Sequence, residues 1–70
     1  MRIRLTDEKL LADLLGFMRA SGCIAYYPAE PESIEVVRQH TFGEKEVAEV
    51  TVLLDRWRAE HREAEPEILG

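Results

Sequence analysis

Apolar side chains recur at spacings of three and four residues between positions 6 and 21, which predicts one amphipathic helix. Thr6 is expected to cap its first turn through the side-chain hydroxyl. Asp7 and Glu8 place negative charge at the positive end of the helix dipole. Gly22 can adopt the left-handed conformation that ends a helix. The apolar stripe of this helix consists of Leu10, Leu11, Leu14, Leu15, Phe17 and Met18.

Three short segments have the period or the composition of β-strands. Residues 1–5 alternate apolar and basic side chains, and residues 23–27 and 33–38 are rich in strand formers. Two prolines in residues 28–32 predict a loop, so the last two strands are expected to form an antiparallel hairpin. The pairs predicted by symmetry about this loop, within one or two positions, are Tyr27–Ser33, Ala25–Glu35 and Cys23–Val37.

A second helix is expected to begin at Glu44, after a loop at residues 39–43, and to end within residues 61–64. Pro66 closes this helical region. Residues 67–69 are either a short edge strand or a frayed tail, and the strand is favoured because two adjacent aliphatic side chains would otherwise stay exposed. The predicted inward stripe of the second helix consists of Val47, Val50, Leu53, Leu54 and Trp57.

The order of these elements predicts the α+β class. A right-handed crossover through the first helix places both helices on one face of a single antiparallel sheet. This is a minimal ferredoxin-like arrangement, βαββα, to which residues 67–69 would add a short fourth strand. We expect residues 1–64 to form a single domain and residues 65–70 to be the edge strand or tail. The other face of the sheet has nothing in the chain to cover it.

Composition narrows the classes of partner and compartment. Seventy residues make one domain near the lower size limit for a self-sufficient core, so any further stabilisation is expected to come from self-association. The net charge of −5 argues against a nucleic acid or an anionic membrane surface as partner. One cysteine cannot form an internal disulfide, and the chain shows neither a signal peptide nor an apolar run of membrane-spanning length. A reduced, cytoplasmic compartment is therefore expected.

Three stretches resemble a group of small uncharacterised bacterial proteins of similar length. They are DLLGFMRASGC, the hairpin segment SIEVV and the second-helix segment LLDRWRAEH. The shared pattern is a helix, a strand introduced by Gly-Cys, a hairpin, and a helix with Trp near its end. The resemblance covers about residues 3–61. It implies the βαββα(β) fold and brings no biochemical activity with it.

Candidate chemistry is sparse. The hairpin is expected to bring Cys23, the only thiol, close to His40, and such a pair could act as nucleophile and base. A buried structural cysteine is the favoured interpretation, because cysteine is among the most buried residue types. Cys23, His40 and His61 match no zinc-ligand spacing. The chain also lacks a P-loop, a dinucleotide fingerprint and a serine elbow, so no catalytic residue, metal or cofactor is expected.

The uncovered face of the sheet is the main candidate for function. Because side chains alternate along a strand, one of Tyr26 and Tyr27 must point away from the helices. If Cys23, Ala25 and Tyr27 face the helices, an aromatic and aliphatic patch with a basic edge lies on the outside. Patches of this kind are typical of protein contacts. The predicted interaction face consists of Arg2, Arg4, Ile24, Tyr26, Glu35 and Val37.

Three hypotheses about function remain open. The first is a non-enzymatic interaction module that uses this face to form a homodimer or to bind another protein. The alternative is a small-molecule-sensing regulatory domain, with a pocket near Tyr26 or Tyr27 and residues 41–43 and with a ligand that the sequence does not identify. A thiol-dependent enzyme using Cys23 is less favoured. RNA binding by the same face is opposed by the acidic charge and the missing basic-aromatic signature.

Overall fold

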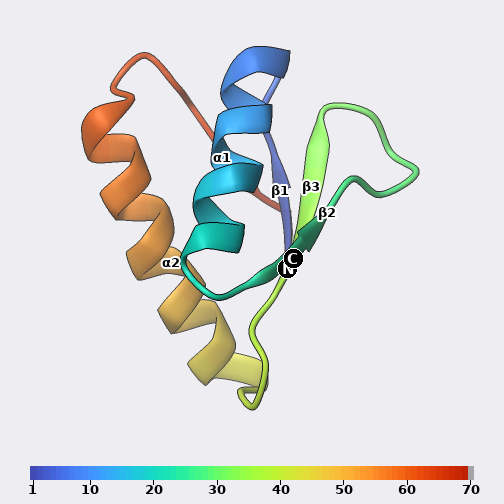
Figure 1. Cartoon of the computed structure of the whole chain (residues 1–70), viewed down its shortest axis with the longest axis vertical. Helices are drawn as coiled ribbons and strands as arrows, with labels where there is room; N and C mark the ends of the chain where they lie inside the picture. Colours follow the sequence, from blue (N-terminus) through green and yellow to red (C-terminus); the bar gives the residue numbers. More distant parts are fainter. Residues whose placement is uncertain (70) are drawn as a thin grey trace.

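The chain folds into a sheet with two helices on one side (Figure 1). The structure is a computed structural model, and it describes residues 1–69. The helices are α1 (Glu8–Ala20) and α2 (Gly43–Glu60), and the strands are β1 (Arg2–Arg4), β2 (Ile24–Tyr26), β3 (Ser33–Val37) and β4 (Glu67–Ile68).

The strand order in the sheet is β2-β3-β1-β4, and each neighbouring pair is antiparallel. Each helix joins two strands that are separated by a third: α1 connects β1 to β2 across β3, and α2 connects β3 to β4 across β1. Both crossovers leave their helix on the same face of the sheet (Figure 1). The predicted α+β class and ferredoxin-like arrangement are confirmed, with β4 as the fourth strand.

Helix α1 begins one residue later than its predicted cap. Asp7, not Thr6, is the N-cap: its carboxylate accepts hydrogen bonds from the amides of Lys9, at 2.9 Å, and Leu10, at 3.2 Å. A carboxylate at this position satisfies two otherwise unpaired amides and also interacts favourably with the helix dipole, which a hydroxyl does not. The prediction of Thr6 as the cap was therefore wrong by one position.

The C-terminal end of α1 is a Schellman turn, and this turn starts β2. Gly22 has a φ of 89°, in the left-handed region that favours glycine. The amide of Cys23 donates to the carbonyl of Met18 at 3.0 Å, and the amide of Gly22 donates to Arg19 at 3.1 Å. The predicted role of Gly22 is confirmed, and the turn sends the chain directly into the sheet.

The hairpin of β2 and β3 has a register one position from the predicted one. Ala25 lies opposite Val36, and Tyr26 lies opposite Glu35. The loop is not symmetric, because Glu32 adopts a φ of 58° just before β3. Burial also requires this register, since Ala25 and Val36 are both core residues and a one-position slip would turn one of them outward.

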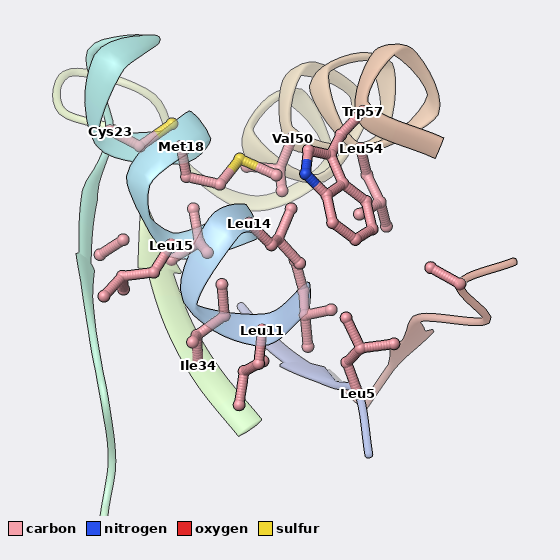
Figure 2. Close-up of a cluster of buried hydrophobic side chains, with 14 residues drawn as sticks. Leu5, Leu11, Leu14, Leu15, Met18, Cys23, Ile34, Val50, Leu54 and Trp57 are labelled. Carbon is pink, nitrogen blue, oxygen red and sulfur yellow. The ribbon is translucent and has the colours of Figure 1, made fainter. Parts of the chain in front are cut away.

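A single hydrophobic core lies between the helices and the sheet (Figure 2). Helix α2 contributes Val50, Leu54 and Trp57 to it, and Leu53 packs at its margin. Val47 was predicted to face inward but is 48% exposed, because the first turns of α2 extend past the sheet and contact little of it. The buried residues are Ile3, Leu5, Leu11, Leu14, Leu15, Met18, Cys23, Ala25, Ile34, Val36, Val50, Leu54, Trp57 and Ala64.

Candidate functional site

The uncovered face of the sheet carries a row of side chains that runs across β2, β3 and β1 to the residue that follows β4. The strand register places Tyr26 beside Glu35 and Glu35 beside Arg2. Leu69 continues this line, because its amide donates to the carbonyl of Arg2 at 2.8 Å and side chains alternate along β4. We call Tyr26, Glu35, Arg2 and Leu69 the central row. It has an apolar side chain at each end and an acid and a base between them.

Two shorter rows flank the central row. On one side, Ile24 lies opposite Val37. On the other side, Arg4 lies between Ser33 and Glu67. Ile24 is 46% exposed and Tyr26 is 47% exposed, although both lie within a strand. All six residues predicted for this face therefore lie on it: Arg2, Arg4, Ile24, Tyr26, Glu35 and Val37. That they bind a partner stays a prediction.

The charges on this face alternate in sign, so the expected basic edge does not exist. The Glu35 carboxylate lies 2.7 Å from the Met1 amino group and 3.8 Å from the Nε of Arg2. Arg4 contacts Glu67 at 3.1 Å. Each arginine of the sheet thus has an acidic neighbour. Sequence reasoning missed Glu67 and Leu69 as members of the face, although the alternation of residues 67–69 would have placed them there once β4 was assumed.

The edge of the sheet at β2 is less suited to binding than the face. The carbonyl oxygen of Ala25 points away from β3 and accepts a hydrogen bond from the Nε of Arg19 at 2.8 Å. A long side chain over a short edge strand blocks the addition of another strand. At the opposite edge, β4 contains two residues. Partner binding by strand addition is therefore disfavoured at both edges.

Other exposed apolar side chains do not form a comparable patch. Phe42 is 86% exposed at the start of α2, and Val47 and Val52 are about half exposed along it. Val47 and Val52 are five positions apart, so they point to different sides of the helix. Ile24, Tyr26 and Val37, by contrast, are direct or next neighbours in the sheet. The contiguous apolar surface is on the sheet.

Cys23 is in contact with an arginine and not with the predicted histidine. The thiol is 7% exposed, and its Sγ lies 3.9 Å from an NH1 of Arg38. The same guanidinium contacts Glu49 at 2.9 Å and the carbonyl of Ser21 at 3.1 Å. The hydrogen bond with Cys23, and after it that with Glu49, raises the pKa of Arg38. This arginine joins the end of α1 to α2.

Native Cys23 is expected to react slowly with a thiol reagent, because its buried Sγ is reached only by local opening of the structure. The measurement is the rate of labelling by a maleimide in buffer and in denaturant, with mass spectrometry. We expect labelling in buffer to be at least about a hundredfold slower. Equal rates would show an accessible thiol and would revive the hypothesis of a thiol enzyme.

Asp13 of α1 contacts two side chains at the end of α2. One is Trp57, and the other is His61, the C-terminal cap residue of α2. The indole Nε1 of Trp57 donates to Asp13 Oδ2 at 2.8 Å, and His61 Nε2 lies 3.0 Å from the same oxygen. The ring of His61 stacks on that of Trp57 with a centroid distance of 4.2 Å, and its Nδ1 lies 2.9 Å from the carbonyl of Trp57. Both ring nitrogens of His61 thus face acceptors within the fold. This arrangement holds α2 against α1 and presents no free base.

Two of the hollows on the surface bear on the hypotheses about function. One, of about 590 Å³, lies beside Arg4, and its lining includes the acidic residues Asp7, Glu63, Glu65 and Glu67. Within residues 1–69, no three Cys, His, Asp or Glu side chains are grouped so that they could hold a metal ion. The acidic hollow is therefore best described as solvated surface.

The second hollow, of about 450 Å³, lies between α1 and the β2–β3 loop and is lined by Tyr27, Glu8 and Leu11 among others. Its volume falls in the range of small-molecule sites. The loop at residues 41–43, which the small-molecule hypothesis placed beside the tyrosines, lies at the other end of β3 (Figure 1). The structure does not bring these two parts together, and the hypothesis stays a prediction centred on Tyr27.

The comparisons add no family to these observations: no family model, no curated protein and no solved structure matches this chain. The resemblance to small bacterial proteins therefore stays a prediction. Neither helix in the described part of the chain combines the length and the apolar composition that crossing a bilayer requires.

Proposed function

We propose that this protein is a non-enzymatic interaction module that associates with a second copy of itself through the open face of the sheet. The observation that carries the proposal is the contiguous group Ile24, Tyr26 and Val37, which lies on strands and is covered by no element of residues 1–69. Exposed apolar patches of this kind usually mark contact sites. Tyrosine and arginine, both on this face, are enriched at the centres of protein interfaces.

A second copy fits this face because its charges alternate. Arg2 and Glu35 are neighbours in the central row, and Arg4 and Glu67 are neighbours in the row beside it. A surface that contains equal numbers of acids and bases in adjacent positions can be complementary to itself. A strongly basic or acidic partner would be attracted by the charge at one position of this face and repelled by the opposite charge at the next. The balance of charge on this face favours self-association over binding to a highly charged molecule.

The association is expected to be weak. Four strands about 4.8 Å apart, with outward residues about 7 Å apart along each, present about 300–400 Å² per copy. A stable interface covers about 800 Å² per partner. The face is smaller than that, so we expect monomers and dimers to exchange in the upper micromolar range. In a reduced compartment such as the cytoplasm, this equilibrium would depend on the local concentration of the protein.

Substitution of Tyr26 by lysine is expected to weaken self-association at least about tenfold, because it removes a half-exposed ring from the patch and adds a charge to each copy. Sedimentation velocity and small-angle scattering, measured from about 10 µM to about 1 mM, would report the dissociation constant. Circular dichroism would confirm that the variant is folded.

Tyr27→Lys is the matched control. Tyr27 is adjacent in sequence and is similarly exposed, at 54%, but it lies on the helix side of the sheet. The proposal expects this variant to associate like the wild-type protein. A wild-type chain that is strictly monomeric at about 1 mM would overturn the proposal, as would equal weakening by both substitutions.

A further inference from the structure

We infer that the two sheets stack about a two-fold axis that runs parallel to the strands between β1 and β3, so that Tyr26 of one copy packs on Leu69 of the other. The inference rests on the proposed self-association and specifies its geometry. It follows from the order of residues in the central row, which reads Tyr26, Glu35, Arg2, Leu69 from one edge of the sheet to the other.

An axis parallel to the strands reverses the central row of the second copy. Tyr26 then faces Leu69 of the second copy, and Glu35 faces its Arg2. Both contacts occur twice, because a two-fold interface is isologous. Arg2 and Glu35 of the two copies form a square of four charges that alternate in sign. One Tyr26–Leu69 pair flanks this square at each end. Every position of the row thus meets a complementary one.

An axis perpendicular to the strands is the other arrangement that keeps the strands aligned and overlays the two faces fully. It would place each residue of the central row opposite the same residue of the second copy, so that Arg2 faces Arg2 and Glu35 faces Glu35. Like charges that face each other across an interface repel and disfavour that pairing. The charge order of the central row therefore selects the parallel axis over the perpendicular one.

The row that contains Arg4 is compatible with this arrangement. With the parallel axis, Arg4 of one copy faces the position of Ser33 in the other, a small side chain whose hydroxyl is already bonded to the carbonyl of Glu30 at 3.0 Å. The Arg4–Glu67 pairs, which lie 3.1 Å apart within each chain, stay at the rim. They are partly exposed there and lose little solvation.

The test is an isotope-filtered NOE measurement on an equal mixture of ¹³C,¹⁵N-labelled and unlabelled protein at about 1 mM, where dimers are populated. Within one chain, Tyr26 and Leu69 are separated by three strand spacings, about 14 Å, which is beyond the range of an intramolecular NOE. We expect intermolecular NOEs between the ring of Tyr26 and the methyl groups of Leu69. NOEs from Tyr26 to Tyr26 would overturn the geometry while leaving the proposed function intact.

A second measurement uses Leu69, which lies at the β4 edge of the sheet and is not part of the apolar group Ile24, Tyr26 and Val37. Leu69→Ser is expected to weaken dimerisation about tenfold, because both Tyr26 contacts of the dimer lose their partner. Val52→Ser, at a similarly exposed position on α2, is the control and should leave the dissociation constant unchanged. A dimer insensitive to Leu69→Ser would overturn the geometry, whereas the absence of any dimer would overturn the proposed function and the geometry together.

Discussion

Replacement of Trp57 by alanine is expected to lower the free energy of unfolding by about 3–5 kcal/mol. The side chain is the largest fully buried one, with 1% exposure, and it packs between α1 and α2 above the sheet (Figure 2). The substitution removes the indole from the core, the hydrogen bond to Asp13 at 2.8 Å and the stacking partner of His61. A core of this size rarely supplies more than about 3–5 kcal/mol in total. Much of the variant population should therefore be unfolded at 25 °C.

The measurement is urea denaturation followed by circular dichroism, because Trp57 is the only tryptophan and its fluorescence is lost with it. Trp57→Phe is the control that keeps most of the apolar volume and removes the hydrogen bond. It should lower the free energy of unfolding by about half as much or less, since the Asp13 carboxylate is 55% exposed, can be solvated and still has His61 Nε2 3.0 Å away. A Trp57→Ala variant that unfolds like the wild type would show that the contact between α1 and α2 does not stabilise the fold.

Ile34→Ala is expected to lower the free energy of unfolding by about 2–4 kcal/mol. Ile34 lies on the central strand β3 opposite Ile3 of β1, and both side chains are 0% exposed. Both strands are flanked on each side by another strand, so the backbone cannot shift easily to fill the cavity that the substitution leaves. The loss of buried methyl groups and the unfilled cavity add to one another.

Ile24→Ala is the matched control for Ile34→Ala, because it makes the same change in a strand at a position that is 46% exposed. It should cost about 1 kcal/mol or less, measured at low micromolar concentration where the protein is monomeric. The double variant Ile3→Ala with Ile34→Ala tests whether the pair is coupled: we expect a cost smaller than the sum of the two single costs. Equal effects at Ile34 and Ile24 would contradict the assignment of inner and outer faces.

Much of the fold was predictable because local signals agree with one another. The stripe of α1, the glycine at its end and the prolines of the β2–β3 loop each point to one boundary, and the observed elements lie within one or two residues of the predicted ones. The differences in the cap of α1 and in the hairpin register arose where the local sequence was compatible with two neighbouring positions. Thr6 and Asp7 are both good caps, and the geometry of the turn selects Asp7. The hairpin register lies one position from the symmetric pairing, within the range that was predicted, because Glu32 takes a left-handed conformation that symmetric pairing ignores.

The candidate site was only partly predictable. The six predicted residues lie on the outer face because alternation along a strand is a local property. The row of Tyr26, Glu35, Arg2 and Leu69 was not predictable, since it depends on the register of three strand pairs and on whether β4 forms. The bonds of Asp13 to Trp57 and His61 and the contact of Cys23 with Arg38 join residues that are far apart in the sequence or in different elements. No local pattern marks them.

By itself, the sequence determined which segments are helices and strands, most of the side chains that enter the core, and that both helices lie on one face of the sheet. The hydrophobic period, the capping residues and the turn residues act over a few positions, so short segments of the sequence specify these features. The tertiary structure alone decided which outward residues become neighbours and that their charges alternate. Register and strand order arise from packing the whole core at once, and a slip of one position changes every neighbour on the face.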